Sequence, residues 1–300
     1  MKYSVGIDIG GTNTRIAIID DNYQIIERVQ FSTNTQDVYA TLNTIKEKLA
    51  KFDYPYVAVG LSAPGPLDLI NGVILEAPNL GENWWNFSIS AELSNLLNRP
   101  VYLDNDANLA ALAEAVVGEG KDYNHVQFLT ISTGLGSGLV IDKNIYLGAH
   151  GFAHEIANIC LWRNGPQHGN LFPGGIEAIC SGSAITNRAQ KANLLVNHAG
   201  DVNDLALMKN PIALEIMSDA KEYLANAIAI IYAFIDPDIV ILGGSVALKI
   251  PNFVSEVELL VKKRVFNCIK PYINIRKSTL NEDSGLIGAA ILAFQKQALS

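Results

Sequence analysis

The feature that most constrains the fold is a pattern that occurs twice, near residue 10 and again near residue 135. The first copy is an apolar run, YSVGIDI, followed by GGTNT and then by RIAIID. The second copy is VQFLTIS, then TGLGSG, then LVIDKNIYLG. Apolar, β-branched runs on both sides of a short glycine-rich segment predict two β-hairpins. The repetition has two interpretations: a coincidence of common glycine turns, or an internal duplication into two related halves.

Strands and helices alternate along the rest of the chain, which is typical of an α/β fold. We expect strands at 56–62 and within PVYLD, and helices at about 37–51, 88–97 and 107–117. A longer helix is expected over about 213–235. Its apolar residues recur every three or four positions and predict one buried face, formed by Leu214, Met217, Ala220, Leu224, Ala227, Ile231 and Phe234. DIVILGGS then predicts a buried strand, and Ser245 could cap the helix that follows it.

Composition and charge exclude several classes of protein. The 300 residues are 49% hydrophobic and 17% charged, which is typical of a globular chain. The net charge of -8 argues against nucleic acid and against an anionic membrane surface as partners. The most apolar run, AIAIIYAFI at 227–235, is too short to span a bilayer. The three cysteines are widely spaced and form no CxxC pair, so we expect a cytoplasmic protein with reduced thiols.

The two glycine-rich segments could bind phosphate. In DIGGT, Gly10 and Gly11 allow a tight turn that exposes backbone N–H groups, and such groups form an anion site. Thr12 adds a hydroxyl donor, and Asp8 could hold a hydrated Mg²⁺. The segment contains no lysine and is therefore not a Walker A loop. By itself it is weak evidence for a phosphate site, and a plain hairpin tip is the more common interpretation.

The second glycine-rich segment, TGLGSG at 133–138, precedes a strand rather than a helix, so it is not a Rossmann fingerprint. Together with the first segment and with Gly243-Gly244, it predicts three glycine turns at strand ends. Such turns could surround a nucleotide.

Three polar residues, Asp104, Asn105 and Asp106, lie where an apolar strand ends and an alanine-rich helix begins. The positive end of the helix dipole would favour the ionised form of Asp106. An aspartate in this position could simply cap the helix.

The order of these motifs resembles the ROK family of sugar kinases over essentially the whole chain. The motifs that carry the resemblance are DIGGTNTRIAIID, SAPGPLD, APNLG, DNDANLAALAE, TISTGLGSGLVI, GFAHEIAN, GIEAICSGSAI, VILGGSV and DSGLIGAA. The resemblance implies a two-domain actin/hexokinase-like (ribonuclease H-like) fold, with the duplicated hairpin as phosphate loop and with an interdomain cleft. We place the domains at 1–117 and 118–300, and the last helix, about 285–298, could pack back on the first domain.

The resemblance also implies roles for individual residues. Asp106 corresponds to the catalytic base of the family, and Asp104 to a structural residue at the strand end. ATP with Mg²⁺ would be bound through Asp8, Gly10, Gly11, Thr12, Asn13, Thr133, Gly134, Gly136, Gly138, Gly243 and Gly244. The sugar would be bound through Ser62, Asn79, Asn105, Asp106, Glu155, Asn158 and Glu177. A homodimer is the family expectation.

One segment departs from the family pattern. Many relatives hold a structural zinc with one histidine and three cysteines, in motifs like EIGH and CxCGxxGC. Here Asn158 replaces the histidine, and the three cysteine positions are occupied by His168, Asn170 and Gly175. This donor set cannot close a zinc tetrahedron, so we expect no structural zinc. The segment 163–175 must then be held by packing, and its expected anchors are Leu171, Phe172 and Pro173.

The expected function is an ATP-dependent hexose kinase that phosphorylates the 6-hydroxyl of glucose or of an N-acetylhexosamine such as N-acetylmannosamine. Fructose, mannose or a β-glucoside are alternative substrates. A non-catalytic sugar sensor or regulator is the alternative class. Repressors of the family carry a DNA-binding segment ahead of the sugar-binding part, whereas the first hairpin here starts at residue 3. Together with the acidic charge, this favours the kinase.

Overall fold

The structure is a computed structural model that describes residues 1–280 and 283–299. The chain divides into two compact units. The first contains Met1–Val117, Asn144–Ala153 and Glu282–Ser300, and the second contains Gly118–Lys143 and His154–Asn281. The units differ from the expected division because 144–153 belongs to the first unit, whereas the sequence already allowed for the C-terminal helix there.

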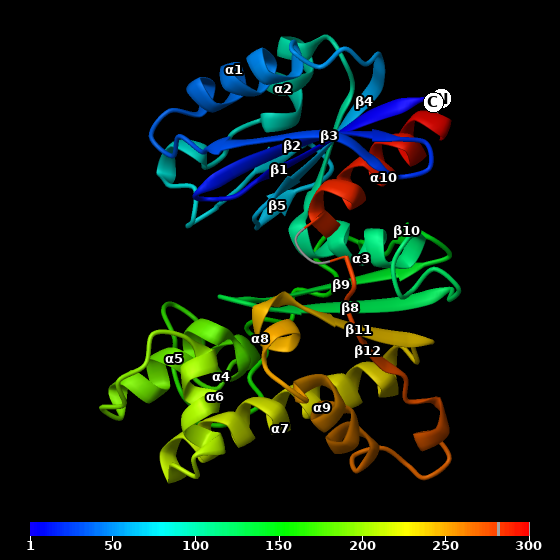
Figure 1. The fold of residues 1–300 in the computed structure, drawn as a ribbon. Helices are drawn as coiled ribbons and strands as arrows, with labels where there is room; N and C mark the ends of the chain where they lie inside the picture. Colours follow the sequence, from blue (N-terminus) through cyan, green and yellow to red (C-terminus); the bar gives the residue numbers. More distant parts are fainter. Residues whose placement is uncertain (281–282, 300) are drawn as a thin grey trace. The chain divides into compact units, whose positions relative to one another are not determined.

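A twisted sheet forms the centre of the first unit (Figure 1). Its strands have the order β3-β2-β1-β4-β7, with bounds Ile25–Ser32, Asn13–Asp20, Tyr3–Ile9, Tyr56–Ala63 and Val101–Asn105. β1 and β2 form the antiparallel hairpin predicted from the sequence, and β1, β4 and β7 are parallel to one another. Because parallel neighbours point the same way, the carboxyl ends of these three strands meet at one edge of the sheet.

Helices cover both faces of this sheet (Figure 1). α1 and α2 lie on one face, where they share a core with alternate residues of β1 and β2, among them Ile7 and Ile18. α10 lies on the other face, against Ala17 and Ile19. The helices of this unit are α1 (Val38–Leu49), α2 (Ile89–Leu97), α3 (Asp106–Val116), α10 (Ser284–Leu299) and the short η1 (Glu82–Trp84). A small sheet of β5 (Leu67–Asp68) and β6 (Val73–Ile74), and the two-residue strand β10 (Asn144–Ile145), complete its elements.

α10 approaches the sheet so closely that only glycine fits beneath it. A Cβ atom on Gly60 of β4 would lie 1.7 Å from the carbonyl oxygen of Ala289. A Cβ atom on Gly6 of β1 would lie 2.2 Å from the carbonyl oxygen of Leu286. Leu286 and Ala289 are buried. The C-terminal helix is therefore part of the core of the first unit.

The second unit repeats this strand order. Its sheet contains β9-β8-β11-β12, with bounds Leu135–Ile141, His125–Ile131, Ile239–Gly243 and Ile275–Lys277. β8 and β9 form the second predicted hairpin, and β11 is parallel to both β8 and β12. Each unit thus has a hairpin followed by two parallel strands in the same spatial order. This equivalence favours internal duplication over coincidence.

The second unit contains the two helices predicted from its sequence, at about 213–235 and after DIVILGGS, and several that were not predicted. Its helices are α4 (Ile176–Cys180), α5 (Gly182–Lys191), α6 (Ala199–Leu207), α7 (Pro211–Phe234), α8 (Gly244–Lys249), α9 (Phe253–Lys262) and η2 (Lys270–Tyr272). On α7 the central residues of the predicted face are buried, but Leu214 and Phe234 are 46% and 83% exposed, so the prediction is wrong for these two. They lie in the first and last turns, and periodicity does not show how far along a helix its neighbours reach.

The prediction that Ser245 caps α8 is also wrong. The N-cap is Gly243, and no side chain donates or accepts a capping hydrogen bond there. Across residues 1–280 and 283–299, no helix combines the length and the apolar character needed to cross a bilayer.

Candidate active site

The ends of three parallel strands bring predicted site residues together in the first unit. Asp8 at the end of β1 is in register with Ser62 on β4, and Ser62 is in register with Asp104 on β7. Asn105 ends β7 beside Ala63. In open α/β sheets, ligands bind outside the carboxyl ends of the strands. This edge is therefore the natural position for a binding site in the first unit.

Both oxygen atoms of the Asp8 carboxylate accept hydrogen bonds. Its Oδ2 atom accepts hydrogen bonds from Arg15 Nη2 at 2.6 Å and from Arg15 Nε at 3.2 Å. Its Oδ1 atom accepts one from Ser62 Oγ at 2.8 Å. The carboxylate is therefore not arranged as a direct metal ligand. It fits a contact to a hydrated Mg²⁺ through water, because the Oδ1 atom can accept a hydrogen bond in addition to that from Ser62 Oγ.

The glycine tip of the first hairpin is hydrogen-bonded to Thr33, the residue after β3, and packs against a loop. Thr33 Oγ1 donates to Gly10 O at 2.7 Å, and Gly10 N donates to Asn13 O at 2.9 Å. A Cβ atom on Gly11 would lie only 2.2 Å from Asn79 O, so the position requires glycine. The tip thus brings predicted nucleotide-binding residues next to Asn79, a predicted sugar-binding residue.

The two aspartates at the junction of β7 and α3 have opposite environments. Asp104 is buried, and its Oδ1 atom accepts hydrogen bonds from Asn105 N at 2.8 Å and from Asn108 Nδ2 at 2.9 Å. Burial raises the pKa of Asp104 to about 6, although these two hydrogen bonds and Lys296 partly oppose the shift. Asp106 is exposed and is the first residue of α3.

Asn105 is the residue that caps α3. Its side-chain oxygen accepts a hydrogen bond from Ala107 N at 2.8 Å. Asp106 Oδ1 also contacts this N–H group, at 2.7 Å, but Asp106 lies inside the helix. Helix capping therefore does not account for Asp106, and the alternative that it is merely the cap is wrong.

The turn of the second hairpin is shorter than the sequence predicts. It comprises only residues 132–134, and Ser132 N donates to Gly134 O at 2.9 Å to close it. Gly136 and Gly138 lie within β9, where they pair with Thr130 and Phe128. The glycine pattern alone could not distinguish a turn from a glycine-rich strand.

Gly243 and Gly244 lie beside this second hairpin. Gly243 ends β11, and Gly244 begins α8 with a φ of 81°. A Cβ atom on Gly244 would lie 2.4 Å from Ile131 O, so the close approach of α8 to β8 requires glycine there.

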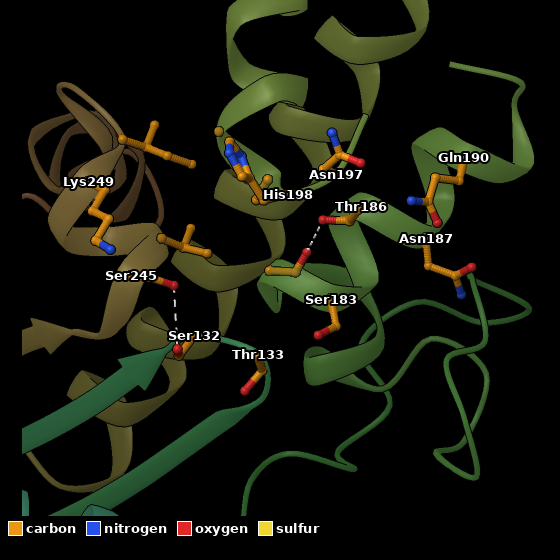
Figure 2. A pocket seen from close by; sticks show the side chains of 15 residues that line it. Ser132, Thr133, Ser183, Thr186, Asn187, Gln190, Asn197, His198, Ser245 and Lys249 are labelled. Atoms are coloured by element: carbon orange, nitrogen blue, oxygen red, sulfur yellow. Dashed lines mark hydrogen bonds between the residues drawn. The ribbon is translucent and has the colours of Figure 1, made fainter. Parts of the chain in front are cut away.

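A pocket of about 540 Å³ opens beside this turn, wholly within the second unit (Figure 2). Figure 2 shows Ser132 and Thr133 of the turn at one side, and Ser245 and Lys249 of α8 nearby. The Oγ atoms of Ser132 and Ser245 lie 3.4 Å apart. The remaining labelled side chains come from α5 and from the chain just before α6: Ser183, Thr186, Asn187, Gln190, Asn197 and His198. Its size suits a small-molecule ligand.

Of these lining residues, the sequence predicted only Thr133 as a binding residue. The four residues from α5 recur at i, i+3, i+4 and i+7 and so share one helix face. A polar face of this kind is also what any solvent-exposed helix has. The sequence therefore contains no signal that would separate this pocket wall from an ordinary surface.

The segment between His154 and Glu177 carries the remaining predicted sugar-binding residues. Glu155 is exposed, and partial loss of surrounding solvent raises its pKa. The side-chain oxygen of Asn158 accepts a hydrogen bond from Phe172 N at 2.7 Å, so it closes a loop within the segment. Glu177 Oε2 accepts a hydrogen bond from Leu135 N at 2.7 Å, which places its carboxylate against the turn of the second hairpin.

The predicted anchors of this segment are wrong in part. Phe172 is 65% exposed and Pro173 is exposed, whereas Leu171 is half-buried. The anchor is instead Trp162, whose ring stacks on Tyr223 with centroids 4.9 Å apart and planes at 5°. His168, at a former cysteine position, contacts Asn187. No cluster of three or more His, Cys, Asp or Glu side chains that could hold a metal ion occurs in the part of the chain that the structure describes.

The predicted residues thus form two sets, one in each unit. The first unit holds Asp8, Gly10, Gly11, Thr12, Asn13, Ser62, Asn79, Asn105 and Asp106. The second unit holds Thr133, Gly134, Gly136, Gly138, Glu155, Asn158, Glu177, Gly243 and Gly244.

Comparison with known proteins defines the class. The model of the ROK family matches residues 4–296, and this chain belongs to that family. A glucokinase of Halalkalibacterium halodurans is 28% identical over 319 residues, which cover 99% of this chain and 96% of the relative. An N-acetylmannosamine kinase of Vibrio cholerae is 31% identical, with 82% of this chain and 84% of the relative covered. A xylose repressor of Bacillus spizizenii is 25% identical, with 98% of this chain and 77% of the repressor covered.

Solved structures agree with this assignment. A ROK hexokinase from Thermus thermophilus matches with a TM-score of 0.91 at 28% identity, covering 99% of this chain and 100% of that one. A ROK family glucokinase from Streptomyces griseus, in complex with glucose and AMPPNP, matches with a TM-score of 0.79 at 25% identity, covering 98% and 99%. The chain therefore has the two-domain actin/hexokinase-like fold, and the fold class predicted from the sequence is confirmed.

Proposed function

We propose that this protein is an ATP-dependent sugar kinase that transfers the γ-phosphate of ATP to the 6-hydroxyl group of a hexose. The observation that carries the proposal is the position of Asp106. Its carboxylate is exposed at the first residue of α3, while Asp104 is buried and Asn105 caps the helix. Asp104 thus has a structural role and Asn105 has no carboxylate, which leaves Asp106 as the carboxylate suited to chemistry.

The proposed reaction needs one group that moves a proton. Asp106 orients the sugar hydroxyl and accepts its proton as the sugar oxygen bonds to the γ-phosphorus. The bond between that phosphorus and the β–γ bridging oxygen breaks, and ADP leaves. Phosphoryl transfer depends mainly on positioning and on neutralisation of charge. The start of α3 supports the ionised form of Asp106, because the helix dipole favours negative charge there.

The nucleotide would occupy the pocket of the second unit. The turn at 132–134 lies at one side of this pocket, so its backbone N–H groups could contact phosphate oxygens. When bound with ATP, Mg²⁺ would neutralise phosphate charge. Asp8 is the residue that would contact its hydration shell. The AMPPNP complex of the Streptomyces griseus relative supports ATP as the phosphate donor.

We propose two candidate sugars as the substrate. Glucose and N-acetylmannosamine rank nearly level, since relatives named for each cover most of this chain. Asn79, Asn105, Glu155, Asn158 and Glu177 are the proposed hydroxyl contacts. Amides and carboxylates suit a polyol because they bind neighbouring hydroxyl groups in pairs.

A coupled assay of ADP release over a panel of sugars tests this proposal. We expect turnover with glucose or N-acetylmannosamine, and kcat/KM for the two sugars ranks them. The panel includes fructose, mannose and a β-glucoside. A strong preference for fructose would exclude both leading candidates, and no turnover with any sugar would exclude the kinase.

A second candidate is a sugar-binding regulator without turnover. The xylose repressors among the relatives favour it. Calorimetry with the same sugar panel separates the two candidates. A regulator binds a sugar without releasing ADP, whereas a kinase does both.

A further inference from the structure

Besides its proposed contact to the sugar, the Glu177 carboxylate contacts the turn beside the nucleotide pocket. Its Oε2 atom accepts a hydrogen bond from Leu135 N at 2.7 Å. A Cβ atom on Gly134 would lie 3.0 Å from the same oxygen, so the carboxylate lies directly against the turn backbone. Glu177 is half-buried, in the first turn of α4.

The turn has a second attachment to the same block of helices. Gly182 N, at the start of α5, donates to Ser132 O at 2.6 Å. A Cβ atom on Gly182 would lie 2.8 Å from that oxygen. This attachment joins backbone to backbone and would survive most substitutions. The hydrogen bond from Leu135 depends on a side chain, and mutation can therefore remove it selectively.

The backbone of Glu177 is bound to the other end of the sugar-binding segment. Glu177 N donates to Ala157 O at 3.0 Å, and Ile176 N donates to Ile159 O at 3.0 Å. Asn158 lies between these two bonded positions, and Glu155 is two residues before Ala157. Glu177 thus contacts the phosphate-loop turn through its side chain and the proposed sugar segment through its backbone.

We propose that Glu177 is a positioning residue for the nucleotide, which fixes the turn at 132–135 by accepting the Leu135 N–H. This inference rests on the proposed function, since it assigns the turn to ATP. The hydrogen bond needs an acceptor oxygen at the right distance rather than a negative charge. The backbone of the same residue is hydrogen-bonded to Ala157, so Glu177 joins the turn to the segment of Glu155 and Asn158.

Three substitutions separate the acceptor from the charge. Glu177→Gln retains an oxygen at the same distance, so it should keep the hydrogen bond. Glu177→Ala removes the oxygen, and Glu177→Asp keeps the charge but withdraws it by one methylene group. We expect Glu177→Ala and Glu177→Asp to weaken AMPPNP binding about tenfold, and Glu177→Gln to stay within about threefold of the wild type.

The readout is the Kd of AMPPNP measured by calorimetry with Mg²⁺ and without sugar. Glu215→Ala is the matched control, because it removes an exposed carboxylate of the same unit, on α7 and outside the proposed sites. It should leave the Kd of AMPPNP unchanged. Thermal midpoints identify variants that fail to fold. If Glu177→Ala does not fold, the comparison of Glu177→Asp with Glu177→Gln still decides.

Two results would overturn the role of Glu177. One is a folded Glu177→Ala or Glu177→Asp variant that binds AMPPNP as tightly as the wild type. The other is a Glu177→Gln variant as weak as Glu177→Asp, which would make the charge rather than the acceptor decisive. Failure of the proposed function is distinct: the wild type itself would bind no AMPPNP or turn over no sugar.

Discussion

At the scale of single residues, the proposal that Asp106 is the catalytic base can be tested against Asp104, the other carboxylate at the junction of β7 and α3. Asp106→Asn keeps the shape and the start of α3 but cannot accept a proton. We expect kcat to fall by about 10²–10⁴-fold, which is the usual contribution of a general base. Sugar binding, measured by calorimetry, should remain largely intact.

Asp104→Asn is the matched control two residues away. It should cost far less turnover, because the amide oxygen can still accept the hydrogen bonds from Asn105 N and Asn108 Nδ2. If Asp104→Asn proved the more damaging substitution, Asp106 would not be the base.

The raised pKa of Asp104 predicts a pH-dependent contribution to stability. In the unfolded chain this carboxyl loses its proton near its ordinary pKa of 3.8, whereas in the folded chain it does so at about 6. The folded state therefore binds the extra proton between these values, and stability falls as pH rises through this window. Above it, the buried charge costs up to about 3 kcal/mol.

Asp104→Asn removes this cost. Relative to the wild type, the variant should gain free energy of unfolding at pH 7.5 and gain little at pH 4. Urea denaturation at both values measures the difference. A gain of equal size at both pH values would contradict the assigned pKa shift.

At the scale of elements, the loop 159–175 is organised around Trp162. The N–H groups of Leu161 and Trp162 both donate to Gly174 O, and a Cβ atom on Gly174 would lie 1.8 Å from Trp162 O. The guanidinium carbon of Arg188 lies 5.7 Å from the centre of the Trp162 ring, and Arg188 pairs with Asp219 at 2.5 Å. An aromatic stack and a cation–π contact thus fix the loop to α5 and α7.

Trp162→Ala should therefore destabilise the protein by roughly 3 kcal/mol, the lower end for loss of a large aromatic side chain. Trp162→Phe retains a ring for the stack and should lose much less. Thermal denaturation measures both. Equal midpoints for Trp162→Ala and the wild type would show that the loop is held by other contacts.

The same loop lacks the donor set for a structural zinc, and this predicts how the protein responds to metal removal. We expect a chelator to leave the thermal midpoint unchanged, while activity still requires added Mg²⁺. Elemental analysis of protein purified without a metal-binding tag is the check. Stoichiometric zinc whose removal lowers the midpoint would contradict this prediction.

Sequence patterns predicted elements well where the signal is local. The hairpin around Gly10 and the helix expected at about 37–51 depend on contacts within a few residues, such as the hydrogen bond from Ala40 N to the Asp37 side chain. The predictions failed where distant segments decide. Trp162 is an anchor because Tyr223 lies beneath it, and Ser245 faces Ser132 instead of capping its helix. The second contact of Glu177 was likewise invisible, since Leu135 is 42 residues away.

At the scale of the whole molecule, the first unit depends on a helix from the end of the chain. α10 packs on β1 and β4, and Leu286, Ala289 and Ala290 are buried there. A chain truncated after Thr279 would expose this face of the sheet to water. We expect the first unit of the truncated chain to be unfolded, as limited proteolysis would show by rapid cleavage within residues 1–117.

A truncation after Gln297 is the control, because it leaves nearly all of α10 in place. It should resist proteolysis like the full chain. Protection of residues 1–117 in the chain that ends at Thr279 would show that the sheet is stable without α10.

The dependence of β1 on α10 has a consequence for synthesis on the ribosome. The strands of the first unit emerge first, but the helix that covers them is translated last, after the whole of the second unit. The second unit has its own continuous hydrophobic core and can fold while translation continues. The nascent sheet, with Gly6 and Gly60 uncovered, cannot complete its core until α10 has been translated. We therefore expect the sheet of the first unit to complete its folding only after α10 has been translated. During synthesis, chaperones should bind this sheet.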